Sequence, residues 1–405
     1  MKAYERFLNY VVVHTASSEE TDCTPTTACQ FDLSRLLEKE MLEMGMENVY
    51  VDEHAYVYGS ISASEGYEKL PCIAFIAHLD TIPDFCGENV KPRLIPNYDG
   101  GEVVLGDSGR VLSPENFPKL PSLKGQTLIV TDGTTVLGAD DKAGIAEIMR
   151  ACERIITENI PHGKIAVCFT PDEEVGHGAS LLDLERLGAD FAYTLDGGEL
   201  DEICYETFNA AAAAWEVNGF NVHPGSAKDT MINASLVAME INSMLPAGEV
   251  PADTDGREGF FHLMEMSGNV EKARLSYIIR DHDPHAFLHR KNTMLHIEKL
   301  INAKYGEGTA KLEIREQYRN MEEVLREHMD VVKIMENAIR RSGLEPVCAP
   351  IRGGTDGSQL SFRGLPCPNI GTGGYGFHGP YEHITAERLE EAAELILNII
   401  AESIK

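Results

Sequence analysis

The sequence predicts an α/β protein with a mixed, mostly parallel sheet, helices on both faces, and a smaller α+β domain inserted into the larger one. Three observations support this prediction. In the first half, short continuous apolar runs alternate with helical patterns. After about residue 206, alternating strand patterns flank an amphipathic helix. The last segment returns to buried runs and a closing helix.

The apolar runs of the first half are too continuous for strands with one exposed face, so buried strands are expected. They cover 72–77, 127–130, 165–170 and 191–195. A helix is expected over 142–158, where apolar residues recur at helical spacing. The Pro- and Gly-rich stretch 86–125 predicts an elaborated loop between two core strands.

In the second half, strand patterns begin near Ala210 and cover 273–283 and 310–320, with a helix over 231–245. A long helix over about 321–341, buried runs at 365–370 and a helix over about 386–403 then follow. We therefore expect one domain from residues 1–206 and 321–405, interrupted by a smaller domain from residues 207–320.

Size and composition limit the classes of function. A chain of 405 residues with 43% hydrophobic content can form two cores. The formal net charge of -30 argues against nucleic acid and anionic membranes as partners and favours divalent cations. No apolar stretch approaches the roughly 18 residues of a membrane span, and no signal peptide is recognisable. Nine scattered cysteines without a C-x-x-C pair predict reduced thiols in the cytoplasm.

The first candidate ligands follow the predicted strand 72–77. His78 and Asp80 are two residues apart, so in extended chain both side chains point the same way. Ligands bind at the carboxyl ends of strands in open α/β sheets. A lone histidine at a strand end is usually structural. The acidic pairs elsewhere in the chain are what favour a functional role for His78.

Two acidic pairs accompany the histidine. Asp140 and Asp141 precede the predicted helix 142–158, where a simple cap needs only one aspartate. Glu173 and Glu174 follow the strand 165–170. Because adjacent residues outside a helix face apart, one carboxylate can bind a metal while its neighbour faces a water. The alternative is a pair of solvated loop acids.

Two more donors complete the set. Asp196 follows the strand 191–195, and His378 lies after a Gly-rich loop near the end of the chain. Zinc accepts histidine together with carboxylates, and a bridging aspartate can hold two ions. The absence of a thiolate from the set argues against a structural zinc finger. His383 stands five residues beyond His378 and competes with it for the role of last ligand.

Several motifs occur in a fixed order. HLD at 78–80, ADDKAG at 139–144, PDEEVGHGA at 171–179 and LDGGE at 195–199 are similar to the motif series of the M20 metallopeptidases. VTDGTTVLGADDKAG, RGGTDGS and FHGPYE resemble in particular the members that cleave tripeptides. The likeness spans essentially the whole chain. It implies a zinc-exopeptidase-like fold whose inserted domain acts as a lid or a dimerisation domain.

The resemblance also implies a ligand set for two zinc ions per subunit, with Co²⁺ or Mn²⁺ as alternatives. Asp140 would bridge the ions, and Asp80 would orient a ligand histidine. Glu173 would be the general base. The Asp140–Asp141 peptide bond is expected to be cis. The ligands completing the two sites would be His78 with Asp196, and Glu174 with His378, which fits the family spacing better than His383.

Three further residues match positions that contact substrate in the family. His223 would donate to the developing oxyanion, whereas Arg280 and Arg352 would bind the peptide carboxylate through planar guanidinium donors. Taken alone, each is more simply a surface residue. In some relatives the histidine equivalent to His223 acts across a dimer, so a homodimer is an open alternative.

The expected function is that of a cytoplasmic metallo-aminopeptidase that releases the N-terminal residue from tripeptides. One alternative is another M20-type hydrolase, such as a dipeptidase, an aminoacylase or an N-acyl-diamino-acid deacylase. A second alternative is a non-catalytic binding module, although such a protein would not need Glu173. GTGGYG at 371–376 matches a dinucleotide-binding pattern but lacks the helix that should follow it.

Overall fold

The computed structural model describes residues 1–21 and 23–405. The chain forms two compact units. The larger contains Met1–Tyr205, Glu323–Ala349 and Thr355–Lys405, and the smaller contains Glu206–Glu322 and Pro350–Gly354. Pro350–Gly354 thus groups with the smaller unit, whereas the division expected from the sequence placed it in the larger; the domain limits stay a prediction. Among the described residues, no helix has the length and apolar character needed to cross a membrane.

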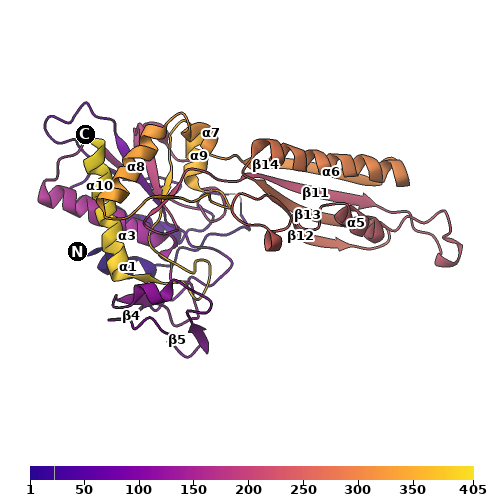
Figure 1. Cartoon of the computed structure of the whole chain (residues 1–405), viewed down its shortest axis with the longest axis horizontal. Coiled ribbons are helices and arrows are strands. Elements are labelled where there is room, and N and C mark those ends of the chain that lie inside the picture. The colour runs from indigo at the N-terminus through magenta and orange to yellow at the C-terminus, as the bar shows by residue number, and fades with distance from the viewer. Residues whose placement is uncertain (22) are drawn as a thin grey trace. The chain divides into compact units, whose positions relative to one another are not determined.

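The larger unit is built on an eight-stranded mixed sheet (Figure 1). Strands β8, β3, β9 and β16 run parallel to one another, whereas β1, β2 and β8 pair antiparallel. This confirms the predicted fold class. In spatial order the strands are β1 (Glu47–Val51), β2 (Val57–Ile61), β8 (Ile165–Thr170), β3 (Ile73–His78), β9 (Phe191–Leu195), β16 (Asn369–Ile370), β10 (Glu202–Cys204) and β15 (Val347–Cys348).

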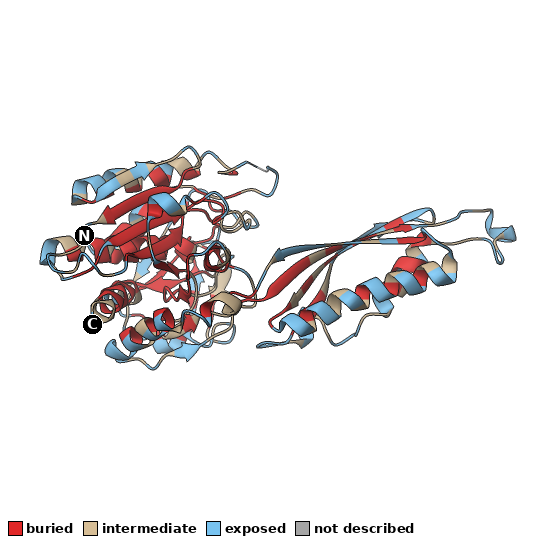
Figure 2. Cartoon of the chain, turned by 90° about the horizontal axis from the view of Figure 1, so that it is seen from above, coloured by how far each residue is buried: buried red, intermediate tan, exposed pale blue. Residues whose placement is uncertain are grey.

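Helices cover both faces of this sheet because the central strands are buried on both sides (Figure 2). On one face, apolar residues from five helices join one large core. These helices are α1 (Ala3–Val11), α2 (Gln30–Met44), α3 (Ala139–Glu158), α8 (Met329–Arg341) and α10 (Ala386–Ser403). A second core on the opposite face includes residues of α4 (Leu184–Leu187) and α9 (Asp356–Phe362).

One predicted core strand belongs to a different sheet. Residues 127–130 do form a buried strand, β7 (Leu128–Val130), but it pairs antiparallel with β17 (Ile384–Thr385) and β4 (Arg93–Ile95). The stretch expected to be a loop also contains β5 (Val103–Leu105), β6 (Arg110–Leu112) and the short helix η1 (Leu120–Leu123). These elements bury their own small core, which explains why β7 is apolar without joining the main sheet.

The smaller unit is a four-stranded antiparallel sheet whose apolar residues pack with those of two helices. The strands, in spatial order, are β12 (Phe260–Gly268), β13 (Lys272–Asp281), β11 (Asn209–Asn218) and β14 (Ala310–Tyr318). The helices are α5 (Ala234–Ser243) and α6 (Pro284–Tyr305), with the short helices η2 (Pro224–Ser226) and η3 (Pro251–Asp253) in the connections.

Two helical segments differ from expectation. Helix α6 was not predicted, because its buried apolar residues are widely spaced and Leu288, Leu295 and Leu300 are exposed. Its start is nevertheless well encoded: Asp283 accepts hydrogen bonds from two N–H groups of the first turn, and Pro284 follows. The helix expected over 321–341 is interrupted between α7 (Glu322–Leu325) and α8, where the N–H of His328 bonds to the Leu325 carbonyl, 2.8 Å, in a turn.

Helix α3 carries a buried carboxyl group that has no role in the site described below. Glu147 is fully buried, and neither of its carboxyl oxygens has a hydrogen-bond partner among the described residues. Burial raises its pKa well above the usual value. Because this acid binds its proton more tightly in the folded than in the unfolded protein, stability should fall as pH rises above the unfolded pKa of about 4.3.

We therefore predict that Glu147→Met stabilises the larger unit. The gain should be about 1–3 kcal/mol near neutral pH, the scale of an unsatisfied buried polar group. It should shrink towards pH 4, where the glutamate is protonated in both states. Urea unfolding at several pH values measures this, with Glu158→Met on the exposed end of the same helix as control. A gain that did not depend on pH would contradict the assignment.

Candidate metal centre

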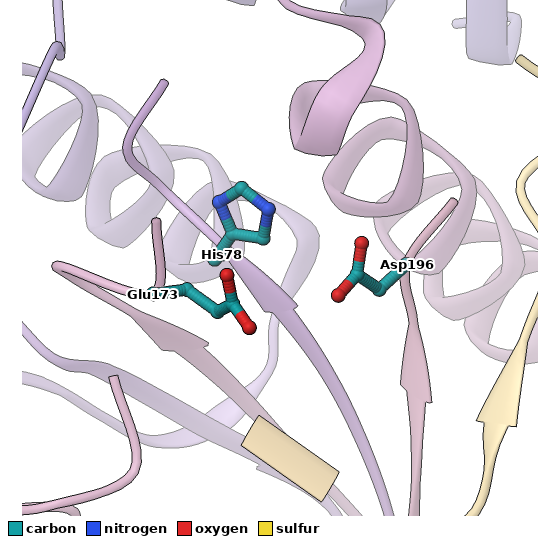
Figure 3. A group of neighbouring side chains, drawn as sticks. All are labelled: His78, Glu173 and Asp196. Atoms are coloured by element: carbon teal, nitrogen blue, oxygen red, sulfur yellow. The ribbon is translucent and has the colours of Figure 1, made fainter. Parts of the chain in front are cut away.

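The candidate site lies at the carboxyl ends of three neighbouring parallel strands, β8, β3 and β9. His78 is the last residue of β3, Glu173 follows β8, and Asp196 follows β9 directly. Figure 3 shows these three side chains gathered around one space. One ligand atom from each lies within 4.8 Å of the others. The sheet topology therefore brings together residues that are far apart in sequence.

Asp140 occupies the middle of the cluster. One carboxylate oxygen lies 2.8 Å from Nε2 of His78, and the other lies 3.2 Å from Nε2 of His378. His378 also lies 3.2 Å from the carboxylate of Glu174. His78, Asp140 and Glu174 form a second group, in which one ligand atom from each residue lies within 4.8 Å of the others. The five residues predicted as ligands thus converge, with Asp140 between the two imidazoles.

The competing histidine lies elsewhere. His383 is fully buried, its Nδ1 lies 2.8 Å from the Tyr381 carbonyl, and its ring stacks on Tyr375. Burial lowers its pKa to about 4. The structure thus brings His378, and not His383, to Asp140.

The backbone around Asp140 is held by a second acid. The Asp140–Asp141 peptide bond is cis, as the resemblance implies. The carboxylate of Glu382 accepts hydrogen bonds from the N–H groups of Leu137, Gly138 and Asp140, at 2.6, 2.8 and 2.9 Å. The position of Asp140 therefore depends on Glu382, for which no role was assigned from the sequence; its spacing from His378 was the only signal.

Asp80 and Asp172 hold the turn that carries the two glutamates. The Asp80 carboxylate accepts hydrogen bonds from the N–H groups of Glu173 and Glu174, at 3.0 and 3.2 Å. It also lies 3.4 Å from Nδ1 of His78, and the Asp80 backbone carbonyl lies 3.0 Å from the same nitrogen; the orienting role of the Asp80 side chain stays a prediction. Asp172 accepts from the backbone and hydroxyl of Thr26 and from Gln30. Asp172 was not predicted, because nothing local marks its partners 142 or more residues away.

Burial and mutual repulsion dominate the electrostatics of the cluster. Burial, followed by the charge of Asp196, raises the pKa of Glu173 well above its usual value. Burial and the charge of Asp140 raise the pKa of Asp196 to about 7. Asp140 is the exception: hydrogen bonds from His378 and His78 outweigh burial and hold its pKa below the usual range. Hydrogen bonds from His378 to Asp140 and Glu174 raise the pKa of its imidazole to about 10.

The residues present fit a divalent metal pair. Within residues 1–21 and 23–405, no lysine or arginine forms an ion pair with Asp140, Glu173, Glu174 or Asp196. One buried oxygen of Glu174 has no hydrogen-bond partner in this part of the chain. Imidazole and carboxylate are ligands that zinc and similar ions accept. A cluster of carboxylates whose only basic neighbours are histidines is one that a bound dication would neutralise.

The three remaining predicted residues lie in the smaller unit. Nδ1 of the exposed His223 accepts a hydrogen bond from the Gly225 N–H, 3.1 Å, which leaves Nε2 to carry the proton in the neutral ring. Arg280 lies over the Tyr318 ring and bonds to the carbonyls of Ala211 and Ile279. Arg352 bonds to the 254–258 turn, through the carbonyls of Thr254, Gly256 and Glu258 and the Thr254 hydroxyl.

Comparisons with known proteins agree with this geometry. Residues 136–402 match the family model "Peptidase family M20/M25/M40". The chain is 53% identical to peptidase T of Clostridium perfringens, with 98% of each chain covered. It is 50% identical to peptidase T of Halothermothrix orenii, again over 98% of each.

Solved structures share the fold. An aminopeptidase PepT from Bacillus cereus superposes with a TM-score of 0.79 at 24% identity, covering 100% of this chain and 98% of that one. A tripeptidase from Staphylococcus aureus gives 0.78 at 22% identity, with the same coverage. The chain therefore belongs to the peptidase family M20/M25/M40 and is a metallopeptidase related to the enzymes named peptidase T.

Proposed function

We propose that the protein is a two-zinc aminopeptidase that removes the N-terminal residue from tripeptides. The observation that supports this most is the convergence of two imidazoles and several carboxylates around Asp140, with no lysine or arginine ion-pair partner among the described residues. The relatives support the substrate class, since they carry the names peptidase T and tripeptidase. The nine cysteines, scattered along the chain without a C-x-x-C pair, support a reducing cytoplasmic compartment.

Five residues would hold the metal ions. Asp140 would bridge them, because its two oxygens face different histidines. His78 and Asp196 would complete one site, and Glu174 and His378 the other. When bound, the ions would supply Lewis acidity that polarises the scissile carbonyl and lowers the pKa of a water molecule.

Glu173 would act as the general base. Its carboxylate accepts no hydrogen bond from the described residues, while its N–H is held by Asp80. It would take a proton from the attacking water at a carboxylate oxygen and return it to the leaving amine. Glu173 also lies in a group of potential metal ligands with His78 and Asp196, so metal content distinguishes a base from a ligand at this position.

The smaller unit would bind the substrate. His223, whose Nε2 carries the proton, would donate to the oxyanion. Arg280 and Arg352 would bind the peptide carboxylate, although Arg352 would first have to release some of its bonds to the 254–258 turn. A role for His223 across a homodimer remains part of the proposal.

We predict that Glu173→Gln lowers kcat by about 10²–10⁴-fold, because the amide keeps the shape but cannot accept the proton. Metal analysis should still find about two ions per chain, as expected for a residue that is not a ligand. The neighbouring Glu174→Gln is the matched comparison and should lose metal instead. If Glu173→Gln kept near-normal kcat, or lost metal as Glu174→Gln does, the base role would be wrong.

A second prediction concerns substrate length. Activity should require a free N-terminus and fall sharply beyond about three or four residues, since a site that binds both the amine and the carboxylate measures the distance between them. Rates on a series of alanine peptides from two to six residues test this, with an N-acetylated amino acid as the probe for the acylase alternative. Equal rates on tripeptides and hexapeptides would exclude a site that binds both ends of the peptide.

A further inference from the structure

Helix α9 is bonded to the loop that carries Glu173 and Glu174. The hydroxyl of Thr170 donates to the carboxylate of Asp356, 2.7 Å. The side-chain amide of Gln359 donates to the Gly176 carbonyl, 3.1 Å. The guanidinium of Arg363, just after the helix, donates to the carbonyls of Ala179 and Leu182. Helix and loop are therefore joined at several points.

Asp356 is one of the buried residues in these contacts. Its side chain is only 3% exposed. A Cβ atom on Gly178 would lie 2.3 Å from one of its oxygens, so only glycine allows the loop to come this close. On the same residue, the hydroxyl of Tyr56 donates to the Gly178 carbonyl, 2.7 Å. Gly178 is thus fixed between a buried carboxyl group and a buried phenol.

Asp356 therefore lies next to residues at both ends of the loop, Thr170 and Gly178. Thr170 is the last residue of β8 and precedes the glutamates, whereas Gly178 follows them. Between these two points, Asp80 accepts hydrogen bonds from the N–H groups of Glu173 and Glu174, and Asp172 is bonded to Thr26 and Gln30. A loop fixed at both ends has fewer backbone conformations, so the glutamate side chains start from a defined position.

Capping of the helix does not explain this residue. Thr355 already fills that role, because its hydroxyl accepts a hydrogen bond from the Ser358 N–H, 3.2 Å. The Asp356 carboxylate instead bonds to a residue 186 positions away. Burying a carboxyl group is costly, and this contact lies at the base of the candidate metal centre.

We propose that Asp356 is a positioning residue that fixes the loop 171–178 and thereby the carboxylates of Glu173 and Glu174. This inference rests on the proposed function for its effect on turnover. Its effect on the loop can be measured independently.

The test compares Asp356→Ala and the milder Thr170→Val, which removes the donor but keeps the size, with wild type. Asn398→Ala is the control: it removes a partly buried hydrogen bond from the buried Asn398 side chain to Ser342 in the larger unit. Hydrogen–deuterium exchange should be faster in peptides covering 171–182 for both loop variants and unchanged there for the control. The kcat should fall by about 10- to 100-fold, the scale of a small misplacement of catalytic groups, with KM within about threefold.

The proposal is overturned if both loop variants match Asn398→Ala in loop exchange and in kcat, because Asp356 would then contribute only to stability. Glu173→Gln, assayed in parallel, separates the two claims. If it remains active, the proposed base role fails, and exchange in the 171–182 peptides alone decides whether Asp356 positions the loop.

Discussion

The larger unit depends on one unfavourable electrostatic arrangement: several partly buried carboxylates meet near the ends of β8, β3 and β9. Asp140, Glu173, Glu174 and Asp196 have no lysine or arginine ion-pair partner within the described ranges. Burial penalises their charged forms, and their charges repel one another. Histidines offset only part of this cost. The fold must therefore hold these groups in place while an external dication supplies the compensating charge.

Much of the surrounding structure serves to hold them. Asp80 binds the N–H groups of the glutamate turn, and Glu382 binds three N–H groups before and at Asp140. The Asp141 carboxylate accepts from the His78 N–H, 3.0 Å. In each case a carboxylate accepts hydrogen bonds from backbone N–H groups of a different strand or loop. Such bonds fix the position of that segment and leave the negative charge of the ligand carboxylates uncompensated. The result is a set of ligands positioned before any ion binds, which lowers the cost of ordering them on binding.

The parts of the site that depend on local sequence patterns could be predicted from the sequence. Continuous apolar runs located β3, β8 and β9, and the polar residues after them located His78, the glutamate pair and Asp196. The supporting residues could not be found in this way, because Asp172 and Asp356 act on partners distant in sequence. The same limit explains β7, whose apolar pattern was correct but whose strand partners could not be deduced. Helix α6 was missed because its buried face is narrow.

The central claim is that the carboxylate cluster is built for two dications bridged by Asp140. Titration of Zn²⁺ into chelator-treated protein, followed by calorimetry, tests it most directly, with Asp140→Asn as the comparison. The account predicts two ions per wild-type chain and a loss of affinity at both sites in the variant, because one carboxylate serves both ions. A single ion per wild-type chain, or two ions bound unchanged by Asp140→Asn, would contradict it.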